Sequence, residues 1–225
     1  MGMQEVQDCM LYRQQLEQGC QQLGLKVNLT QYKQLISYLQ QLWRWNKAYN
    51  FSAIRNLQDM ISLHLLDSLS AAPALLDKAV NRIIDVGTGA GLPGLVLAIT
   101  IPEKQFTLLD ANSKKIRFLK QVKHELQLAN VNLQLTRAKE FNPNRCYDRV
   151  ISRAFASLPN MLDHTEHLIC PKGQFIAMKG NYPEMEIRNL PSRFSLLNSQ
   201  LLQVPGVTAK RHLISMGLKE AIRIE

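Results

Sequence analysis

The chain has 225 residues, a mass of 25.7 kDa and ordinary globular composition, with 46% hydrophobic and 20% charged residues. A chain of this length can bury most of its apolar surface in one large domain, and its composition excludes intrinsic disorder and collagen-like repeats. The 27 Lys and Arg residues against 18 Asp and Glu give a formal net charge of +9, which favours a polyanionic partner.

Residues 1–80 carry the pattern of amphipathic helices. Apolar residues recur at spacings of three and four within 16–23, 35–43 and 61–69, and Thr30 is the expected cap of the second helix. This part holds seven basic and six acidic residues, so its charges almost balance. We therefore expect it to form a helical cap on the rest of the chain.

Residues 81–225 alternate between strand-like and helix-like segments. Apolar runs of strand length lie at 82–86, 106–109, 131–135, 149–151 and 173–178. Helical patterns between them cover 92–100, 113–128 and 158–169. This alternation predicts a parallel sheet with helices on both faces. The segments 194–204 and 212–216 follow without a long helix between them, so we expect a closing antiparallel pair.

The cysteines give no sign of a metal site or a disulfide framework. They are Cys9, Cys20, Cys146 and Cys170. Because none of them has the close spacing of zinc ligands, we expect reduced thiols in a cytoplasmic protein and no bound metal. Residues 1–10 lack the basic and apolar regions of a signal peptide, and no stretch approaches the roughly 18 apolar residues of a membrane span. We therefore expect no signal peptide and no membrane association.

The strongest chemical signal is a glycine-rich loop between the first expected strand and the next helix. Its sequence is Asp-Val-Gly-Thr-Gly-Ala-Gly-Leu-Pro-Gly at 85–94. Glycines let the chain turn sharply and let a ligand approach the backbone, while the following helix offers free N–H groups. Such loops bind nucleotide cofactors at the carboxyl edge of a sheet, which makes Gly87 and Gly89 candidate cofactor contacts. The spacing at 89–94 also fits the dinucleotide fingerprint, by itself a weak signal.

Two carboxylates narrow the choice of cofactor. Asp85 ends the first strand just before the glycines, where it would repel a pyrophosphate and attract a cation. S-adenosyl-L-methionine carries a sulfonium and an ammonium group, so it suits Asp85 better than NAD does. Asp110 ends the second strand, the position from which a carboxylate accepts hydrogen bonds from ribose hydroxyls. A nicotinamide oxidoreductase is the alternative that the glycine spacing alone supports.

Several separate segments point to one family. They are Asn-Lys-Ala-Tyr-Asn at 46–50, His-Leu-Leu-Asp-Ser at 64–68, the glycine loop at 85–94, Thr-Leu-Leu-Asp at 107–110, Ile-Ser-Arg-Ala-Phe-Ala at 151–156 and Met-Lys-Gly at 178–180. On these segments the sequence resembles the RsmG/GidB family of bacterial small-subunit (16S) rRNA guanine-N7 methyltransferases. The resemblance runs from about residue 20 to the C-terminal strands. The glycine loop alone indicates only a methyltransferase fold, whereas the blocks at 46–50, 64–68 and 151–156 in this order are specific to the family.

The resemblance implies the fold and the cofactor. The fold would be an α/β class I SAM-dependent methyltransferase, Rossmann-like, with a mostly parallel seven-stranded sheet, an antiparallel closing strand and an N-terminal helical extension. Residues 1–80 would be the helical cap and 81–225 the methyltransferase domain, packed as one compact unit. The cofactor would be S-adenosyl-L-methionine, with Asp110 holding its ribose. Its other expected contacts are Gly87, Leu92, Ala138, Lys139 and Arg153.

The sequence departs from the family pattern at two positions. The family usually has a carboxylate where Lys139 stands, and here Glu140 follows it. Three alternatives follow: backbone groups meet the adenine end of the cofactor, Glu140 takes the place of the missing carboxylate, or the match to the family pattern is displaced by one residue here. Leu63 stands where many members have an arginine before the histidine.

The implied acceptor, N7 of guanine, carries a lone pair and no proton. Its attack on the methyl group needs no general base, so catalysis should come mainly from alignment, which can contribute about 7–11 kcal/mol. We therefore name no catalytic acid or base. The segment 152–155 lacks the Asn-Pro-Pro-Tyr/Phe motif of amino-group methyltransferases, which argues against an adenine-N6 or glutamine-N5 target. Two alternatives are methylation of another RNA or base atom and a non-catalytic RNA-binding protein with this fold.

The expected partner is small-subunit rRNA, bound by a monomer. Residues 81–225 hold 20 basic and 12 acidic residues, almost the whole basic excess. Basic side chains crowd the helix at 113–128 outside its apolar stripe, namely Lys114, Lys115, Arg117, Lys120, Lys123 and His124. We expect phosphate contacts there, with Lys114 nearest the cofactor edge. The rival RNA path runs over the helical cap near 46–50.

Four further residues of the expected cap are candidates for a functional role. Trp43 and Trp45 could stack on bases, but Trp43 falls on the apolar stripe and is expected in the core. His64 and Asp67 lie one helical turn apart. By the resemblance, they are expected where the cap meets the cofactor cleft.

Overall fold

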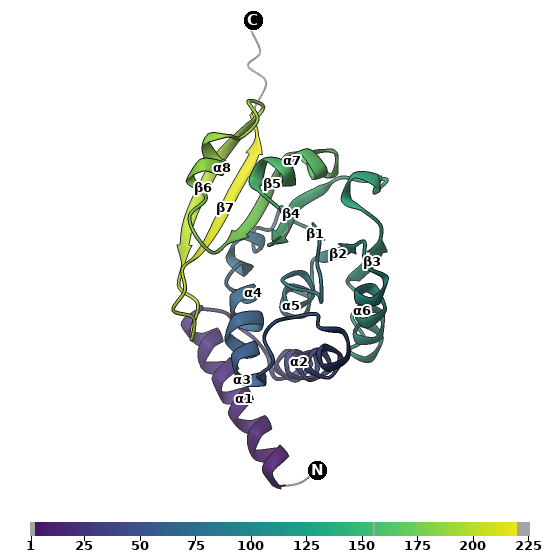
Figure 1. Cartoon of the computed structure of the whole chain (residues 1–225), viewed down its shortest axis with the longest axis vertical. Coiled ribbons are helices and arrows are strands. Elements are labelled where there is room, and N and C mark those ends of the chain that lie inside the picture. The colour runs from purple at the N-terminus through teal and green to yellow at the C-terminus, as the bar shows by residue number, and fades with distance from the viewer. Residues whose placement is uncertain (1–2, 155, 220–225) are drawn as a thin grey trace, which may run out of the picture.

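The computed structural model of the protein describes residues 3–154 and 156–219, with side chains from residue 10 onward. A seven-stranded sheet in the order β3-β2-β1-β4-β5-β7-β6 forms its centre (Figure 1). The strands are β1 (Arg82–Val86), β2 (Gln105–Asp110), β3 (Val131–Leu135), β4 (Tyr147–Arg153), β5 (Ile169–Lys179), β6 (Phe194–Leu202) and β7 (Arg211–Leu218). Strands β1 to β5 are parallel, whereas β7 is antiparallel to both β5 and β6. The expected fold class is confirmed.

Helices cover both faces of this sheet (Figure 1). They are α5 (Gly94–Thr100), α6 (Ser113–Glu125), α7 (Leu158–Thr165), the 3₁₀ turns η3 (Ala138–Glu140) and η4 (Glu166–Leu168), and the short α8 (Glu184–Arg188). Alternate residues of β1 serve the two faces, because Ile83 packs into the core below α5 and α6 while Ile84 packs into the core below α7. The sequence pattern did not indicate α8.

The N-terminal part is helical, as expected. It contains α1 (Met3–Gln22), α2 (Leu29–Tyr49), α3 (Leu57–Met60), a π-helical stretch η1 (Ile61–Leu66), α4 (Asp67–Leu69) and η2 (Ala72–Leu75). The cap of α2 is Asn28, not Thr30 as the sequence suggested. The Asn28 side chain accepts from the Gln31 N–H at 3.0 Å, and the Gln31 side chain accepts from the Asn28 N–H at 2.9 Å. This reciprocal capping box fixes where α2 begins.

Helix α2 is bound to the sheet domain through side chains that reach backbone carbonyls. Gln31 donates to the Ile99 oxygen at 3.0 Å, and Tyr38 donates from its hydroxyl to the Ala90 oxygen at 2.9 Å. Leu35 and Leu42 belong to the same buried cluster as the residues of α5 and β2. The helical part therefore shares one hydrophobic core with the sheet, and α2 touches the glycine loop directly.

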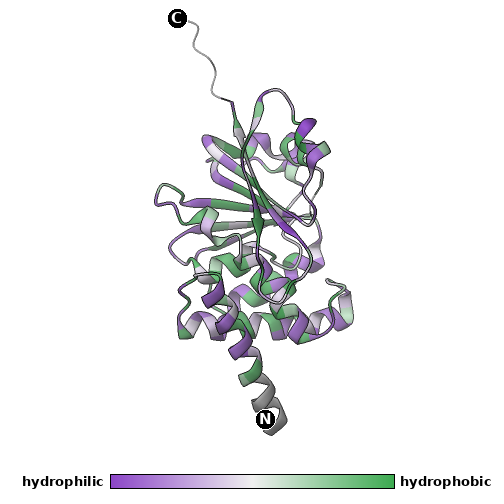
Figure 2. Ribbon diagram, turned by 90° about the vertical axis from the view of Figure 1, so that its left-hand side faces the viewer, coloured by the Kyte–Doolittle hydropathy of each residue, from purple (hydrophilic) through white to green (hydrophobic). Residues whose placement is uncertain are grey.

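Hydropathy follows this layering (Figure 2). The central strands are mostly hydrophobic, whereas many of the hydrophilic residues lie on the helices and turns around them. None of the helices in the described part of the chain combines the length and apolar character needed to cross a membrane. Over the same residues, no three His, Cys, Asp or Glu side chains gather into a group that could hold a metal ion.

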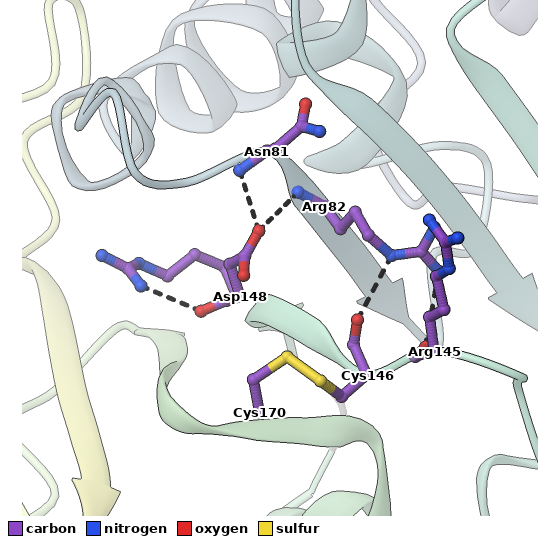
Figure 3. The surroundings of a disulfide bond; sticks show 7 residues. Asn81, Arg82, Arg145, Cys146, Asp148 and Cys170 are labelled. Carbon is purple, nitrogen blue, oxygen red and sulfur yellow. Dashed lines mark hydrogen bonds between the residues drawn. A yellow bond between two sulfur atoms is a disulfide. The ribbon is translucent and has the colours of Figure 1, made fainter.

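One expectation about the cysteines is wrong, because Cys146 and Cys170 form a disulfide (Figure 3). Strands β4 and β5 are parallel neighbours, and Tyr147 pairs with Ile169 where they begin. Cys146 precedes the first of these residues and Cys170 follows the second, which leaves their Cα atoms 5.0 Å apart across 24 residues of sequence. Sheet register brings the thiols together, so sequence spacing could not reveal the pair.

The disulfide lies at the amino edge of the sheet. Beside it, the Asp148 carboxylate accepts from the backbone N–H groups of Asn81 and Arg82, both at 2.8 Å (Figure 3). Cys20 is buried and carries a free thiol, whereas the Cys9 side chain lies outside the described residues. The glycine loop is at the opposite, carboxyl edge, so disulfide and loop are separated by the length of the strands.

Candidate cofactor site

The glycine loop leaves β1 with backbone angles that favour glycine. Gly87, Gly89 and Gly91 have φ values of 69°, 61° and 101°. A Cβ atom on Gly91 would lie 2.8 Å from the Leu95 Cβ and 2.9 Å from a Leu119 methyl carbon. The loop therefore turns sharply and lies tightly against α5 and α6, which explains its glycine content.

Asp85 holds this loop from inside the protein. Its side chain is fully buried, and Oδ2 accepts from the Thr88 hydroxyl at 2.7 Å and from the Gly94 N–H at 2.8 Å. Burial raises the pKa of Asp85 to about 6, while these hydrogen bonds and the charge of Arg153 act in the opposite direction. Oδ1 has no hydrogen-bond partner among the described residues. Asp85 thus shapes the loop rather than standing at the surface.

Asp110 connects the loop to the end of β2. Its Oδ2 accepts from the Gly89 N–H at 2.9 Å, and its Oδ1 accepts from the Asn112 N–H at 2.8 Å. The ammonium of Lys115 lies 3.7 Å from Oδ2. The sequence predicts Lys114 as the basic residue nearest this edge, whereas in the structure Lys115 contacts Asp110. The first turn of α6 therefore borders the Asp110 carboxylate.

A cavity of about 490 Å³ opens where β1, β2 and β3 end. It is lined by Gly87, Leu109, Asp110, Ala111, Thr136, Arg137, Ala138, Lys139, Glu140, Ala156 and His164. Four of the residues expected from the sequence, Gly87, Asp110, Ala138 and Lys139, thus meet in one wall. Lys139 is turned toward Asp163, with 2.8 Å between its ammonium and Oδ2. Glu140, the alternative raised by the sequence, lines the same cavity.

The other expected site residues lie outside this wall. Gly89 faces Asp110 through its N–H, and Leu92 is buried in the core with only 7% of its surface exposed. Arg153, at the end of β4, donates from Nη1 to the Asp67 Oδ2 at 2.8 Å and to the Leu63 oxygen at 3.1 Å. The structure therefore ties Arg153 to the helical cap. Phe155, two residues further along the same segment, lies outside the described residues.

Asp67 binds two arginines at once. Its Oδ2 pairs with Arg153, and its Oδ1 pairs with the Arg211 Nε at 2.8 Å. Asp67 is 3% exposed, so its charge is matched by partners rather than by water. The sequence indicated Asp67 and Arg153 separately and missed Arg211, which no local motif marks. Asp67 thus connects α4, β4 and the first residue of β7.

His64 does not pair with Asp67, although the two are one turn apart. Its Nε2 lies 2.8 Å from the Ser52 hydroxyl and its Nδ1 lies 3.0 Å from the Leu63 oxygen. Burial and the nearby charge of Arg153 lower the pKa of His64 to about 4, so the ring is neutral at physiological pH. His64 therefore fastens the segment after α2 to η1.

The side chains of the cavity wall suit the chemistry of an adenosyl nucleoside. Asp110 offers a carboxylate for hydroxyl groups, Gly87 leaves the backbone open to close approach, and Ala111 and Ala138 offer small apolar surfaces for a flat base. A carboxylate in this wall also disfavours a phosphate on the ribose. The residues present fit an adenosyl group.

The chain matches one protein family over most of its length. The family described as "GidB: rRNA small subunit methyltransferase G" matches residues 31–214. Proteins named "Ribosomal RNA small subunit methyltransferase G" from Marinomonas sp. (strain MWYL1) and Ectopseudomonas mendocina (strain ymp) are 49% and 45% identical. The matches cover 91% and 90% of this chain, and 97% and 94% of those proteins, respectively.

Solved structures share the fold at low sequence identity. The magnesium protoporphyrin IX methyltransferase (ChlM) from Synechocystis PCC 6803 with bound SAM is 16% identical, with a TM-score of 0.60 over 78% of this chain and 90% of that one. TrmN from Thermus thermophilus is 20% identical, with a TM-score of 0.55 over 71% of this chain and 53% of that one. These similarities support the methyltransferase fold.

Proposed function

Because the chain belongs to the rRNA small subunit methyltransferase G family, we propose that it transfers a methyl group from S-adenosyl-L-methionine to N7 of a guanine in small-subunit rRNA. The observation that carries this proposal is the cavity in which Gly87, Asp110 and Ala138 meet at the carboxyl edge of the sheet. A parallel sheet presents its ligand sites at this edge. The dinucleotide alternative lacks comparable support, because the buried Asp85 carboxylate lies under the loop that would hold a pyrophosphate.

In this proposal the cavity residues hold the nucleoside end of the cofactor. Asp110 accepts from ribose hydroxyls, and Gly87 leaves room for the ligand against the backbone. Ala138, Lys139 and Glu140 surround the adenine, with Glu140 in place of the carboxylate that Lys139 replaces. Asp85, Gly89 and Leu92 keep the loop in shape, because Asp85 and Leu92 are buried and the Gly89 N–H donates to Asp110.

When bound, the cofactor supplies an electrophilic methyl group on a sulfonium. The acceptor N7 has a free lone pair, so the protein needs to orient the two reactants rather than move a proton. His64 is unsuited to act as a base, since its ring is buried and bonded to Ser52 and to a backbone oxygen. No catalytic acid or base is assigned.

Arg153 has a positioning role in this proposal. Its guanidinium is fixed by Asp67 and by the Leu63 oxygen, which keeps a positive charge at the end of β4 in a defined place. An arginine pressed against the guanine would repel the charge that develops there. The ion pair with Asp67 holds Arg153 toward the cap, so its proposed role is to fix the end of β4 against the cap.

The organisation of the chain follows from the same proposal. Residues 1–80 act as the cap and residues 81–225 as the methyltransferase domain, joined by their common core. The substrate is rRNA, the protein acts as a monomer, and its place is the cytoplasm, where small-subunit rRNA is found. The basic outer face of α6 takes RNA phosphates, in keeping with the net charge of +9.

The test is methyl transfer in vitro. Purified protein, labelled S-adenosyl-L-methionine and small-subunit rRNA, free or in the subunit particle, are incubated, and the RNA is digested to nucleosides. We expect the label in 7-methylguanosine. Label in another nucleoside would move the acceptor to a different atom, and cofactor and RNA binding without transfer would favour a non-catalytic RNA-binding protein.

A further inference from the structure

An exposed aromatic surface lies beside the cofactor edge and has no role in the site described above. Tyr49, the last residue of α2, is 42% exposed. Its ring stacks on Trp45 with 5.1 Å between centroids and on Phe51 with 5.7 Å and an interplanar angle of 17°. Trp45 and Phe51 also pack on the buried Phe118 of α6. The rings of Tyr49, Trp45 and Phe51 thus form a surface anchored in the core, which we call the ledge.

One cation contacts the ledge, and another contacts the neighbouring Trp43. The Lys114 ammonium lies 5.8 Å from the Tyr49 ring centroid, and the Lys47 ammonium lies 3.4 Å from that of Trp43. Residues 18–58 contain five basic residues and no Asp or Glu; the basic ones are Lys26, Lys33, Arg44, Lys47 and Arg55. The basic excess of this segment, together with the exposed ring of Tyr49 and the nearby Lys114, suits a polyanion that also offers flat apolar faces.

The ledge is connected to the cofactor edge through α6. Lys114 is next to Lys115, whose ammonium is 3.7 Å from the Asp110 carboxylate in the cavity wall. The two RNA paths considered from the sequence, over α6 and over 46–50, therefore meet at the pair Tyr49 and Lys114. A nucleotide on the ledge would lie at the rim of the cavity rather than within it.

We propose that Tyr49 and Lys114 form an RNA subsite at the rim, in which the tyrosine ring stacks on an unpaired base that neighbours the target guanine and the lysine contacts the adjoining phosphate. This inference rests on the proposed function, because it assigns the ledge to the same RNA substrate. Stacking on a tyrosine does not select a particular base, since every base has an aromatic face. The subsite therefore contributes affinity and positions the RNA on the protein, but it does not itself select the guanine.

Salt-dependent binding distinguishes the two residues. The dissociation constant of a small-subunit rRNA transcript is measured over a range of salt concentrations for wild type, Tyr49→Ala and Lys114→Ala. Tyr49→Ala should weaken binding about 5- to 100-fold at every salt concentration and leave the slope unchanged, because stacking releases no counterions. Lys114→Ala should reduce the slope by about 0.7, the value for one phosphate contact on a single strand.

Matched variants control for folding. Tyr49→Phe keeps the ring and should bind like wild type, whereas Tyr49→Leu keeps an apolar contact with Trp45 and should lose affinity like Tyr49→Ala. Leu76→Ala removes another side chain that is 52% exposed, six residues before β1 at the amino edge, and should have no effect. Affinity for S-adenosylhomocysteine should be the same in all of them, which checks that each variant retains its fold.

Intrinsic fluorescence gives an independent readout, because the chain's two tryptophans, Trp43 and Trp45, both lie here. In a Trp43→Phe protein, RNA should change the Trp45 emission with the same dissociation constant as in the binding assay. Unchanged emission on binding, or Tyr49→Ala and Tyr49→Leu proteins that bind like wild type, would overturn the subsite. A wild type that transfers no methyl group to rRNA would instead count against the proposed function, while the binding measurements would still decide on the ledge.

Discussion

Asp67 and Arg153 are 86 residues apart in the sequence and form an ion pair of 2.8 Å between the cap and the end of β4. Asp67 also neutralises Arg211, so its replacement by Asn would leave two arginines without a matching charge. We expect Asp67→Asn to lower the free energy of unfolding by about 3–5 kcal/mol, measured by urea denaturation. Glu17→Gln, which breaks an exposed pair with Arg13, should cost less than about 1 kcal/mol. Equal effects of the two variants would show that Asp67 has no special structural role.

Replacing Asp110 should separate cofactor binding from folding. Asp110→Asn keeps an acceptor oxygen but removes the charge that would receive ribose hydroxyls, and hydrogen bonds to charged groups contribute about 1.5–3 kcal/mol. We expect S-adenosylhomocysteine to bind about 10- to 100-fold more weakly, as measured by calorimetry. Asp59→Asn, which removes an exposed charge on α3, should bind like wild type. Unchanged affinity in Asp110→Asn would place the ribose elsewhere.

The buried histidine should make stability depend on pH. The pKa of His64 falls from its ordinary value to about 4 in the folded protein, so the unfolded chain binds more protons between pH 4 and 6.5. The neutral His64 ring therefore makes its full contribution to the free energy of unfolding above pH 6.5, and this contribution is lost as the pH falls toward 4. The free energy of unfolding of wild type minus that of His64→Gln should therefore rise by about 3 kcal/mol from pH 4 to 6.5.

The free energy of unfolding of wild type has to be compared with that of His64→Gln because Asp85 titrates in an overlapping pH range. Its titration changes stability in the opposite direction. Burial raises its pKa to about 6, so its protonated form stabilises the fold at low pH, and this contribution is lost as the pH rises through 6. Asp85 is present in both wild type and His64→Gln, so subtraction removes its contribution. A difference that is flat from pH 4 to 6.5 would mean that the His64 ring is not held neutral.

The Cys146–Cys170 disulfide should affect stability without affecting the site. It closes a loop of 24 residues at the amino edge of the sheet, and such cross-links contribute about 2–4 kcal/mol. Under oxidising conditions, Cys146→Ser should unfold at lower urea concentration than wild type, and a reductant should remove the difference. Affinity for S-adenosylhomocysteine should be equal in both proteins. A weaker cofactor affinity in Cys146→Ser would show that the two edges of the sheet are coupled.

The sequence predicted most of the fold because strands and helices follow local patterns. The apolar runs at 82–86 and 131–135 coincide with β1 and β3 to the residue. Boundaries shifted where side-chain hydrogen bonds decide them, as with Asn28 at the start of α2. The helix expected at 113–128 ends at Glu125, and Gln127 then adopts a left-handed φ of 54°.

The candidate site was predicted less completely, because its contacts join distant parts of the chain. The sequence indicated Asp110 and Ala138, which line the cavity, but it could not reveal that Asp67 pairs with Arg211, 144 residues away. It suggested Asp85 as a partner for a cation, whereas the structure shows a buried carboxylate bonded to its own loop. The disulfide was missed for the same reason, since only the register of β4 and β5 aligns its cysteines.

The proposed reaction is tested most directly by mapping modified nucleotides in small-subunit rRNA from cells with and without this protein. Mass spectrometry of RNA fragments identifies the base, and cleavage of the chain at 7-methylguanosine locates the atom and the position. We expect one 7-methylguanosine to disappear with the protein and to return when wild type is restored, but not when Gly87→Val, which places a branched side chain in the cavity wall, is supplied. An unchanged set of 7-methylguanosines in cells without the protein would contradict the proposed function.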